Sequence, residues 1–130
     1  MGKSAPIIGV CAALLTSSGA QAYDDAAIYP AAQCAAFWLG FNDYAKRSPF
    51  LDSSPDDLNR SNAFRSVAVR LAPARVAEID RTIQDQRSAM ALLAEAVIYA
   101  NDKQSRKVFE TLTQTCESFA SKHPETRDLK

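Results

Sequence analysis

Two cysteines, Cys34 and Cys116, stand near opposite ends of the segment that follows a hydrophobic leader, and they constrain how this chain can fold. An even pair of cysteines in an oxidising compartment most simply forms a disulfide. This bond would bring the beginning and the end of the domain together. In the chain-entropy model, a loop of this length contributes about 4–5 kcal/mol of stability. Two free thiols are the alternative, while a redox-active pair is disfavoured because there is no C-x-x-C motif.

The first 22 residues contain the three parts of a secretory signal peptide. Lys3 supplies a positive charge, an uncharged apolar stretch runs from Ala5 to Leu15, and Ala20-Gln21-Ala22 fits a cleavage site. We expect cleavage near Ala22, which makes 1–22 a leader and 23–130 a single helical domain. The apolar stretch is shorter than the roughly 20 residues of a membrane span. The predicted location is therefore the periplasm or the extracellular space, with no stable membrane insertion after cleavage.

Composition favours helices and argues against a nucleic-acid partner. The chain has 15 basic and 15 acidic side chains, so it offers no net charge that would attract a polyanion. Gly40 is the only glycine after the leader, whereas a β-sandwich or barrel would need more glycine for its turns.

Apolar side chains recur at intervals of three and four residues, which is the period of an amphipathic helix. The pattern predicts four helices, at about 30–47, 55–71, 73–100 and 103–123. Ser54 before Pro55 is a helix-start signal, and the residue before Pro73 resists the α conformation. The break at Asn101-Asp102 is weakly specified, since no glycine or proline enforces it.

The sequence therefore predicts an all-α fold. It is either a small antiparallel four-helix bundle or an irregular array of four or five helices, with one disulfide joining the first and last helices. A coiled-coil dimer formed through the third helix is a further alternative, so the protein is expected to be a monomer or homodimer.

Specific side chains are assigned to the core and to the ends. The second helix is expected to bury Leu58, Phe64, Val67, Ala68 and Leu71. The last helix should bury Phe109, Leu112, Cys116 and Phe119, with Val108 widening that face. Residues 23–29 are expected to form a lead-in or frayed arm, and residues 125–130 to fray.

The densest aromatic group is the candidate ligand or partner surface. Its members lie on the first predicted helix: Phe37, Trp38, Leu39, Phe41 and Tyr44. Core packing is the simplest interpretation of this group. However, Trp38 and Leu39 are about 100° apart on a helix and cannot both point into one core.

No residue pattern indicates catalysis, a metal or a cofactor. His123 is the only histidine and lies near a helix end, where a structural role is favoured. Asp52, Asp56 and Asp57 lack the order of a calcium loop and fit helix capping instead. The arginines that recur from Arg60 to Arg87 alternate with acidic residues, which is typical of a solvated, ion-paired surface.

These observations favour an exported, non-enzymatic module that binds a protein of the cell envelope or the extracellular space. The alternative is a carrier or sensor of a small apolar ligand held between the helices. For that alternative, the expected lining is Phe37, Trp38, Phe41, Met90 and Phe119. An enzyme without a recognisable motif is a third hypothesis. The sequence does not identify the partner, the ligand or the biological process.

Overall fold

The computed structural model describes residue 2 and residues 25–129. The predicted leader 1–22, apart from Gly2, and its cleavage site at Ala22 therefore lie outside the described residues. In chain order the elements are η2 (Ala27–Ala32), α2 (Gln33–Arg47), α3 (Pro55–Leu71), η3 (Pro73–Arg75), α4 (Val76–Ile98) and α5 (Lys103–Ala120). The all-α prediction is confirmed: four helices pack together and a disulfide joins the first to the last.

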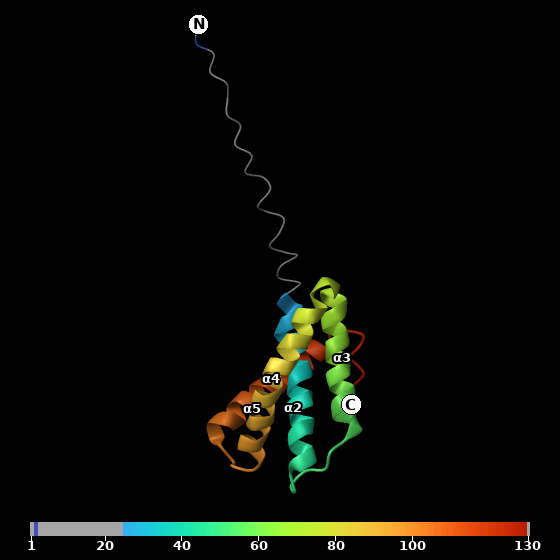
Figure 1. The fold of residues 1–130 in the computed structure, drawn as a ribbon. Coiled ribbons are helices and arrows are strands. Elements are labelled where there is room, and N and C mark those ends of the chain that lie inside the picture. Colours follow the sequence, from blue (N-terminus) through green and yellow to red (C-terminus); the bar gives the residue numbers. More distant parts are fainter. Residues whose placement is uncertain (1, 3–24, 130) are drawn as a thin grey trace.

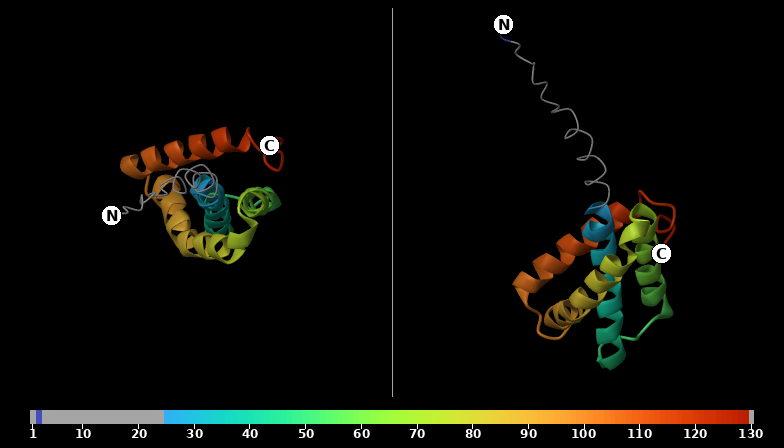
Figure 2. Two further views of the ribbon diagram at one scale, coloured as in Figure 1. Left: turned by 90° about the horizontal axis from the view of Figure 1, so that it is seen from above. Right: turned by 45° about the horizontal axis from the view of Figure 1, so that its top comes forward.

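Helix α2 lies in the middle of the molecule, with α3 and α4 beside it, and α5 crosses the other three at a steep angle (Figures 1 and 2). The hydroxyl of Ser61 on α3 donates to the Ala35 carbonyl of α2 over 2.7 Å. Arg87 on α4 donates to Asp43 of α2 over 2.7 Å. Polar contacts thus tie both neighbours to the central helix.

Gly40 allows α2 and α4 to approach closely. A Cβ at this position would lie 2.6 Å from the Arg87 carbonyl oxygen and 2.6 Å from the Met90 Cβ. Both distances are shorter than van der Waals contact, so only glycine fits without moving the helices apart. A glycine inside a helix often marks such a close backbone approach.

The disulfide joins Cys34 of α2 to Cys116 of α5, with 5.7 Å between their Cα atoms. Both cysteines are buried, among the core side chains Phe64, Val67, Ile79 and Phe119. The predicted contact between the first and last helices is confirmed.

Helix ends follow the local sequence signals. Ser54 caps α3 by accepting from the Asp56 N–H over 3.2 Å, and Pro55 is the first helical residue. Asn101 adopts a left-handed conformation with φ 52°, and Asp102 then caps α5 by accepting from the Ser105 N–H over 2.9 Å. The weakly predicted break between the third and fourth helices is therefore real. The first helix begins three residues later than predicted, because Pro30 belongs to η2, which has an extended residue at Tyr29.

Two side chains that were predicted to be buried are exposed. Leu58 is 37% exposed, because the buried face of α3 begins with Asp57 and Ser61 and adjacent helical residues point about 100° apart. Val108 is 53% exposed, because its neighbour Phe109 faces Phe37 of α2 and adjacent helical residues point about 100° apart.

Both ends of the described chain are better packed than predicted. Ala27 and Ile28 are buried in the core, so they are not part of a frayed arm. At the other end Thr126 is buried and Glu125 is ion-paired with Arg70, so the described residues 125–129 contain firm contacts where fraying was predicted.

Candidate functional site

The five aromatic and apolar residues singled out on α2 separate into two groups. Phe37 and Tyr44 are buried, whereas Trp38, Leu39 and Phe41 are half-buried. The Phe37 ring contacts Trp38 with 5.1 Å between centroids, and it contacts Phe109 of α5 at 5.2 Å. Phe37 therefore serves the core, and Trp38 is the member that reaches a cavity.

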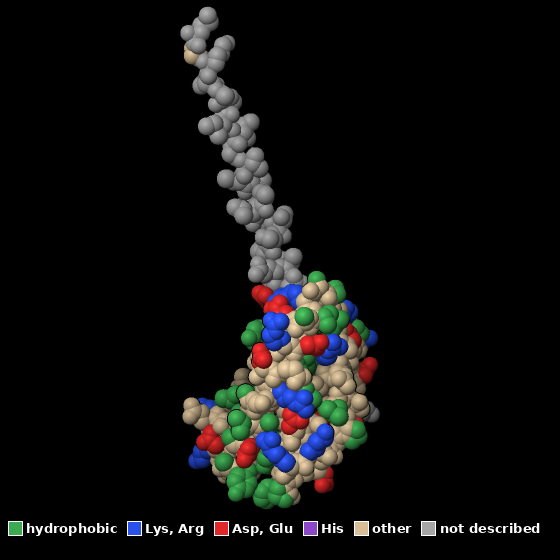
Figure 3. All heavy atoms as spheres, viewed as in Figure 1, with side chains coloured by type: hydrophobic (Ala, Val, Ile, Leu, Met, Phe, Trp, Pro, Cys, Tyr) green, Lys and Arg blue, Asp and Glu red, His purple; other side chains and the backbone are tan. Residues whose placement is uncertain are grey.

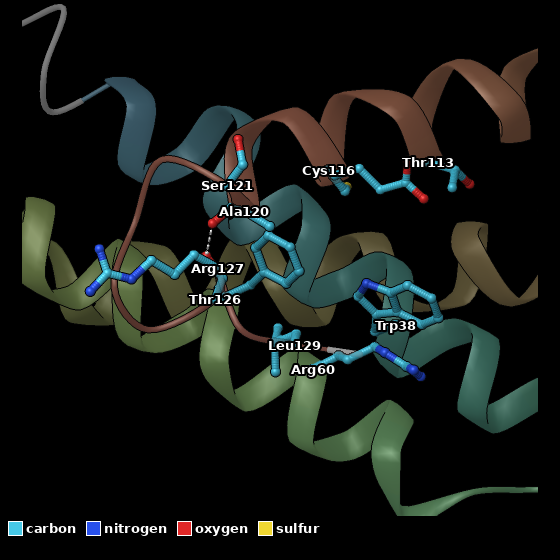
Figure 4. Close-up of a pocket in the computed structure, with 11 residues that line it drawn as sticks. Trp38, Arg60, Thr113, Cys116, Ala120, Ser121, Thr126, Arg127 and Leu129 are labelled. Carbon is cyan, nitrogen blue, oxygen red and sulfur yellow. Dashed lines mark hydrogen bonds between the residues drawn. The ribbon is translucent and has the colours of Figure 1, made fainter.

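That cavity, named here the Trp38 pocket, has a volume of about 280 Å³. It lies between α2, α3, α5 and the segment that follows α5 (Figure 4). Its apolar lining consists of Trp38, Phe64, Cys116, Ala120 and Leu129. The polar residues around it are Arg60, Thr113, Glu117, Ser121, Thr126 and Arg127. Residues from four separate parts of the chain thus enclose one hollow.

Arg60 forms one edge of the Trp38 pocket and is held from two sides. Its guanidinium carbon lies 4.7 Å from the centre of the Trp38 ring, within the range of a cation–π contact. Its Nη1 donates to the Asp57 carboxylate over 3.0 Å. Asp57 is almost completely buried, and this burial raises its pKa, opposed by the charge of Arg60. The sequence analysis assigned Asp57 to helix capping and did not predict this ion pair or the ring that the arginine covers.

The segment after α5 supplies one wall of the pocket and is fastened by polar contacts. The Thr126 hydroxyl donates to the Ala120 carbonyl over 2.9 Å, as Figure 4 shows. Arg70 on α3 holds the Glu125 carboxylate with two hydrogen bonds of 2.8 and 3.0 Å. These contacts explain why Leu129 is placed beside the pocket.

His123 also helps to hold the segment after α5 in place. Its ring contacts Phe119 with 4.3 Å between centroids, and its Nδ1 lies 3.0 Å from Arg70 Nη2. Arginine has no acceptor, so Nδ1 must be unprotonated to accept this bond. Burial lowers the pKa of His123, and the charge of Arg70 lowers it further. The pKa of Glu125 is lowered as well, first by its hydrogen bond from Arg70.

A second feature lies at the opposite end of the molecule, where the C-terminal ends of α2 and α4 are close together. Phe50 and Tyr99 are 62% and 67% exposed, with 5.9 Å between their ring centroids. Leu92, also 62% exposed, precedes Tyr99 by about two turns on the same side of α4. Hydrophobic side chains gather at this lower end in Figure 3. We call Phe50, Leu92 and Tyr99 the Phe50–Tyr99 end.

A shallow hollow of about 250 Å³ adjoins the Phe50–Tyr99 end. Tyr44 lines it together with Pro49 and Tyr99, so this member of the predicted set contributes to the second feature and not to the first. Arg47 and Glu95 also line it and form an exposed ion pair of 3.8 Å. Apolar spacing did not indicate this site, because Phe50 stands in a connection and Tyr99 at a helix end.

In the described part of the chain, no group of three or more His, Cys, Asp or Glu side chains is arranged to hold a metal ion. Over the same residues, no helix is long and apolar enough to cross a membrane.

The chain matches no protein-family model, and comparisons with curated proteins and with solved structures find no match.

Proposed function

We propose that this protein is an exported, non-enzymatic module that binds a protein partner through the Phe50–Tyr99 end. The observation that carries the proposal is the exposure of Phe50, Leu92 and Tyr99 on one side of one end of the molecule. Aromatic side chains dominate the binding energy of many protein interfaces. Grouped and exposed apolar side chains also cost solubility unless a partner covers them.

The surroundings of these side chains are suited to a protein interface. The Phe50 and Tyr99 rings contact each other and leave most of their surface in water. The adjoining hollow offers a depression for a partner side chain, and the Arg47–Glu95 ion pair provides a polar border. An apolar centre with a polar border is the usual composition of such interfaces.

Two observations support export. The sequence pattern of the first 22 residues is that of a signal peptide. The Cys34–Cys116 disulfide is of the kind that persists in oxidising compartments and is rare in the cytosol. We therefore place the partner in the same exported space.

The test is the mass of the protein taken gently from its native compartment. We expect the wild type to carry the mass of a discrete partner. Phe50→Ser/Tyr99→Ser should lose this mass, whereas Tyr29→Ser should retain it, because Tyr29 is similarly exposed but lies near the start of α2. A bare wild-type monomer, or equal loss in both variants, would refute docking at this end.

Denaturing the same sample tests export separately. The expected mass is that of residues 23–130 less two hydrogens, which reports cleavage and the disulfide together. A full-length or fully reduced chain would contradict the exported location while leaving the docking result to stand by itself.

A further inference from the structure

We infer that the Trp38 pocket binds one small, uncharged, apolar molecule. This site is distinct from the Phe50–Tyr99 end, and the inference does not depend on the proposed protein partner. It rests on the lining of the pocket, its volume and the placement of charge around it.

The larger part of the lining surface is apolar, and it comes from elements that the fold holds in fixed positions. Trp38 and Phe64 belong to α2 and α3, and Cys116 is joined to α2 by the disulfide. Leu129 lines the hollow from the segment after α5 (Figure 4). Ligand sites are commonly such concave, mostly apolar hollows between secondary-structure elements.

The volume limits the size of the ligand. A volume of about 280 Å³ is near the lower end of the range of small-molecule sites, about 300–1,000 Å³. A single aromatic ring with a small substituent, or a short alkyl chain, suits a site of this size.

The charges around the pocket argue for an uncharged ligand. Arg60 is already engaged by the Asp57 carboxylate and by the Trp38 ring. Glu117 and Arg127 have opposite charges and are exposed, and the Arg127 guanidinium points away from Trp38 in Figure 4. A charged ligand would have to lose water in the pocket without gaining a dedicated counter-charge, which is unfavourable.

Fluorescence provides a direct test, because Trp38 is the only tryptophan in the chain. The probes are toluene, n-hexanol and hexanoate, each titrated into the oxidised wild-type protein. We expect toluene and n-hexanol to change Trp38 emission in a saturable way, and n-hexanol to bind about tenfold or more tightly than hexanoate. A linear, unsaturable response would overturn the inference. Tighter binding of hexanoate would also overturn it and would indicate an anion site.

Two threonines on α5 provide a matched pair of variants. The hydroxyls of Thr113 and Thr115 each donate to the carbonyl four residues earlier over 2.9 Å, but only Thr113 lines the Trp38 pocket. Thr113→Phe should fill the pocket and abolish the saturable change, while Thr115→Phe should preserve it. Equal responses in the two variants would place the probe elsewhere.

Amide chemical shifts of the wild type provide a test that needs no variant. On addition of toluene, the shifts should concentrate at Phe64, Thr113 and Leu129. Shifts centred on Phe50 and Tyr99 would refute the pocket and assign the probe to the opposite end. The Phe50→Ser/Tyr99→Ser variant should keep the fluorescence response, so failure of the proposed docking and failure of this inference are separate results.

Discussion

The two ends of this molecule differ in what their side chains contact. At one end, the disulfide end, Cys34 and Cys116 are bonded, Phe64 and Phe119 stack in the core, and Arg70 fastens the last residues. At the other, the Phe50–Tyr99 end, Phe50 and Tyr99 contact each other and are largely exposed, while Tyr44 beside them is buried. The disulfide thus fastens one end of the molecule, whereas the other end leaves large apolar side chains exposed.

This contrast shows that the residues that fasten the fold are spatially separated from the residues that we propose for partner binding. The α2 helix extends between both ends and is held along its length by α3 and α4 (Figure 1). A rigid helix anchored by a disulfide keeps the exposed rings in a fixed position, which lowers the entropy lost on binding. Changes at the disulfide end should therefore alter folding, and changes at the other end should alter binding.

The largest effect is expected from removing the disulfide. Cys34→Ala/Cys116→Ala should lower the free energy of unfolding by about 2–5 kcal/mol, because the unfolded chain regains the freedom that the closed loop had removed. Denaturant titration of the oxidised wild type and the variant measures this difference. An unchanged unfolding midpoint would show that the bond does not stabilise this end.

The next effect concerns the middle of α2, between the two ends. Gly40→Ala should destabilise the fold by about 1–3 kcal/mol, since the added methyl would overlap backbone and side-chain atoms of α4. At an exposed helical position, the same substitution is normally stabilising, by about 0.5–1 kcal/mol. The midpoint of thermal unfolding should therefore fall in this variant. A rise in the midpoint would contradict the close approach of α2 and α4.

A smaller effect is expected on acidification, and it should arise at the disulfide end. The folded protein holds the pKa of His123 below its ordinary value of 6.5, so the unfolded chain binds the extra proton more readily. The stability that depends on neutral His123 is present above pH 6.5 and is lost as the pH falls through the folded pKa. Arg70, Lys122 and Glu125 are the charged groups that act on this ring.

His123→Gln isolates this contribution, because glutamine does not titrate. Stability curves of the wild type and the variant should differ in slope below pH 6.5, with the wild type losing stability faster. Parallel curves would show that the His123–Arg70 contact is not linked to folding. Tyr99→Ser, at the opposite end, is the control and should leave the slope unchanged.

The smallest effect on folding is expected from the exposed rings themselves. Phe50→Ser/Tyr99→Ser should change the free energy of unfolding by about 0.5 kcal/mol or less, as is usual for surface positions. Denaturant titration checks this value. A loss as large as that of the disulfide variant would mean that both ends serve the fold, and the contrast between them would fail.

Local signals in the sequence predicted most of the fold correctly. Ser54 and Pro55 start a helix through a cap and a preset φ, and Asn101 and Asp102 end one helix and begin another. The meeting of Cys34 and Cys116 followed from two independent patterns, helical spacing and an even cysteine count. Each of these signals acts within a few residues or through a covalent pairing, so these features could be predicted without knowledge of the tertiary geometry.

Sequence patterns failed where a neighbouring helix or a distant partner decides. Val108 is exposed while the adjacent Phe109 contacts Phe37 of α2, and the spacing of apolar residues does not show which of the two faces that helix. The final segment packs because Arg70, more than fifty residues away along the chain, reaches Glu125 and His123. The Trp38 pocket needs four separated segments, and of the five residues expected to line a site for an apolar ligand only Trp38 lines it.

The Cys34–Cys116 bond also determines what happens when the chain is cut. The connection between α2 and α3 is largely exposed at Pro49, Phe50 and Asp52, and it lies inside the covalent ring. A protease that cleaves there produces two peptides that remain a single covalent molecule until the bond is reduced. The disulfide therefore confers tolerance to cleavage: one nick opens the ring without releasing either helical half.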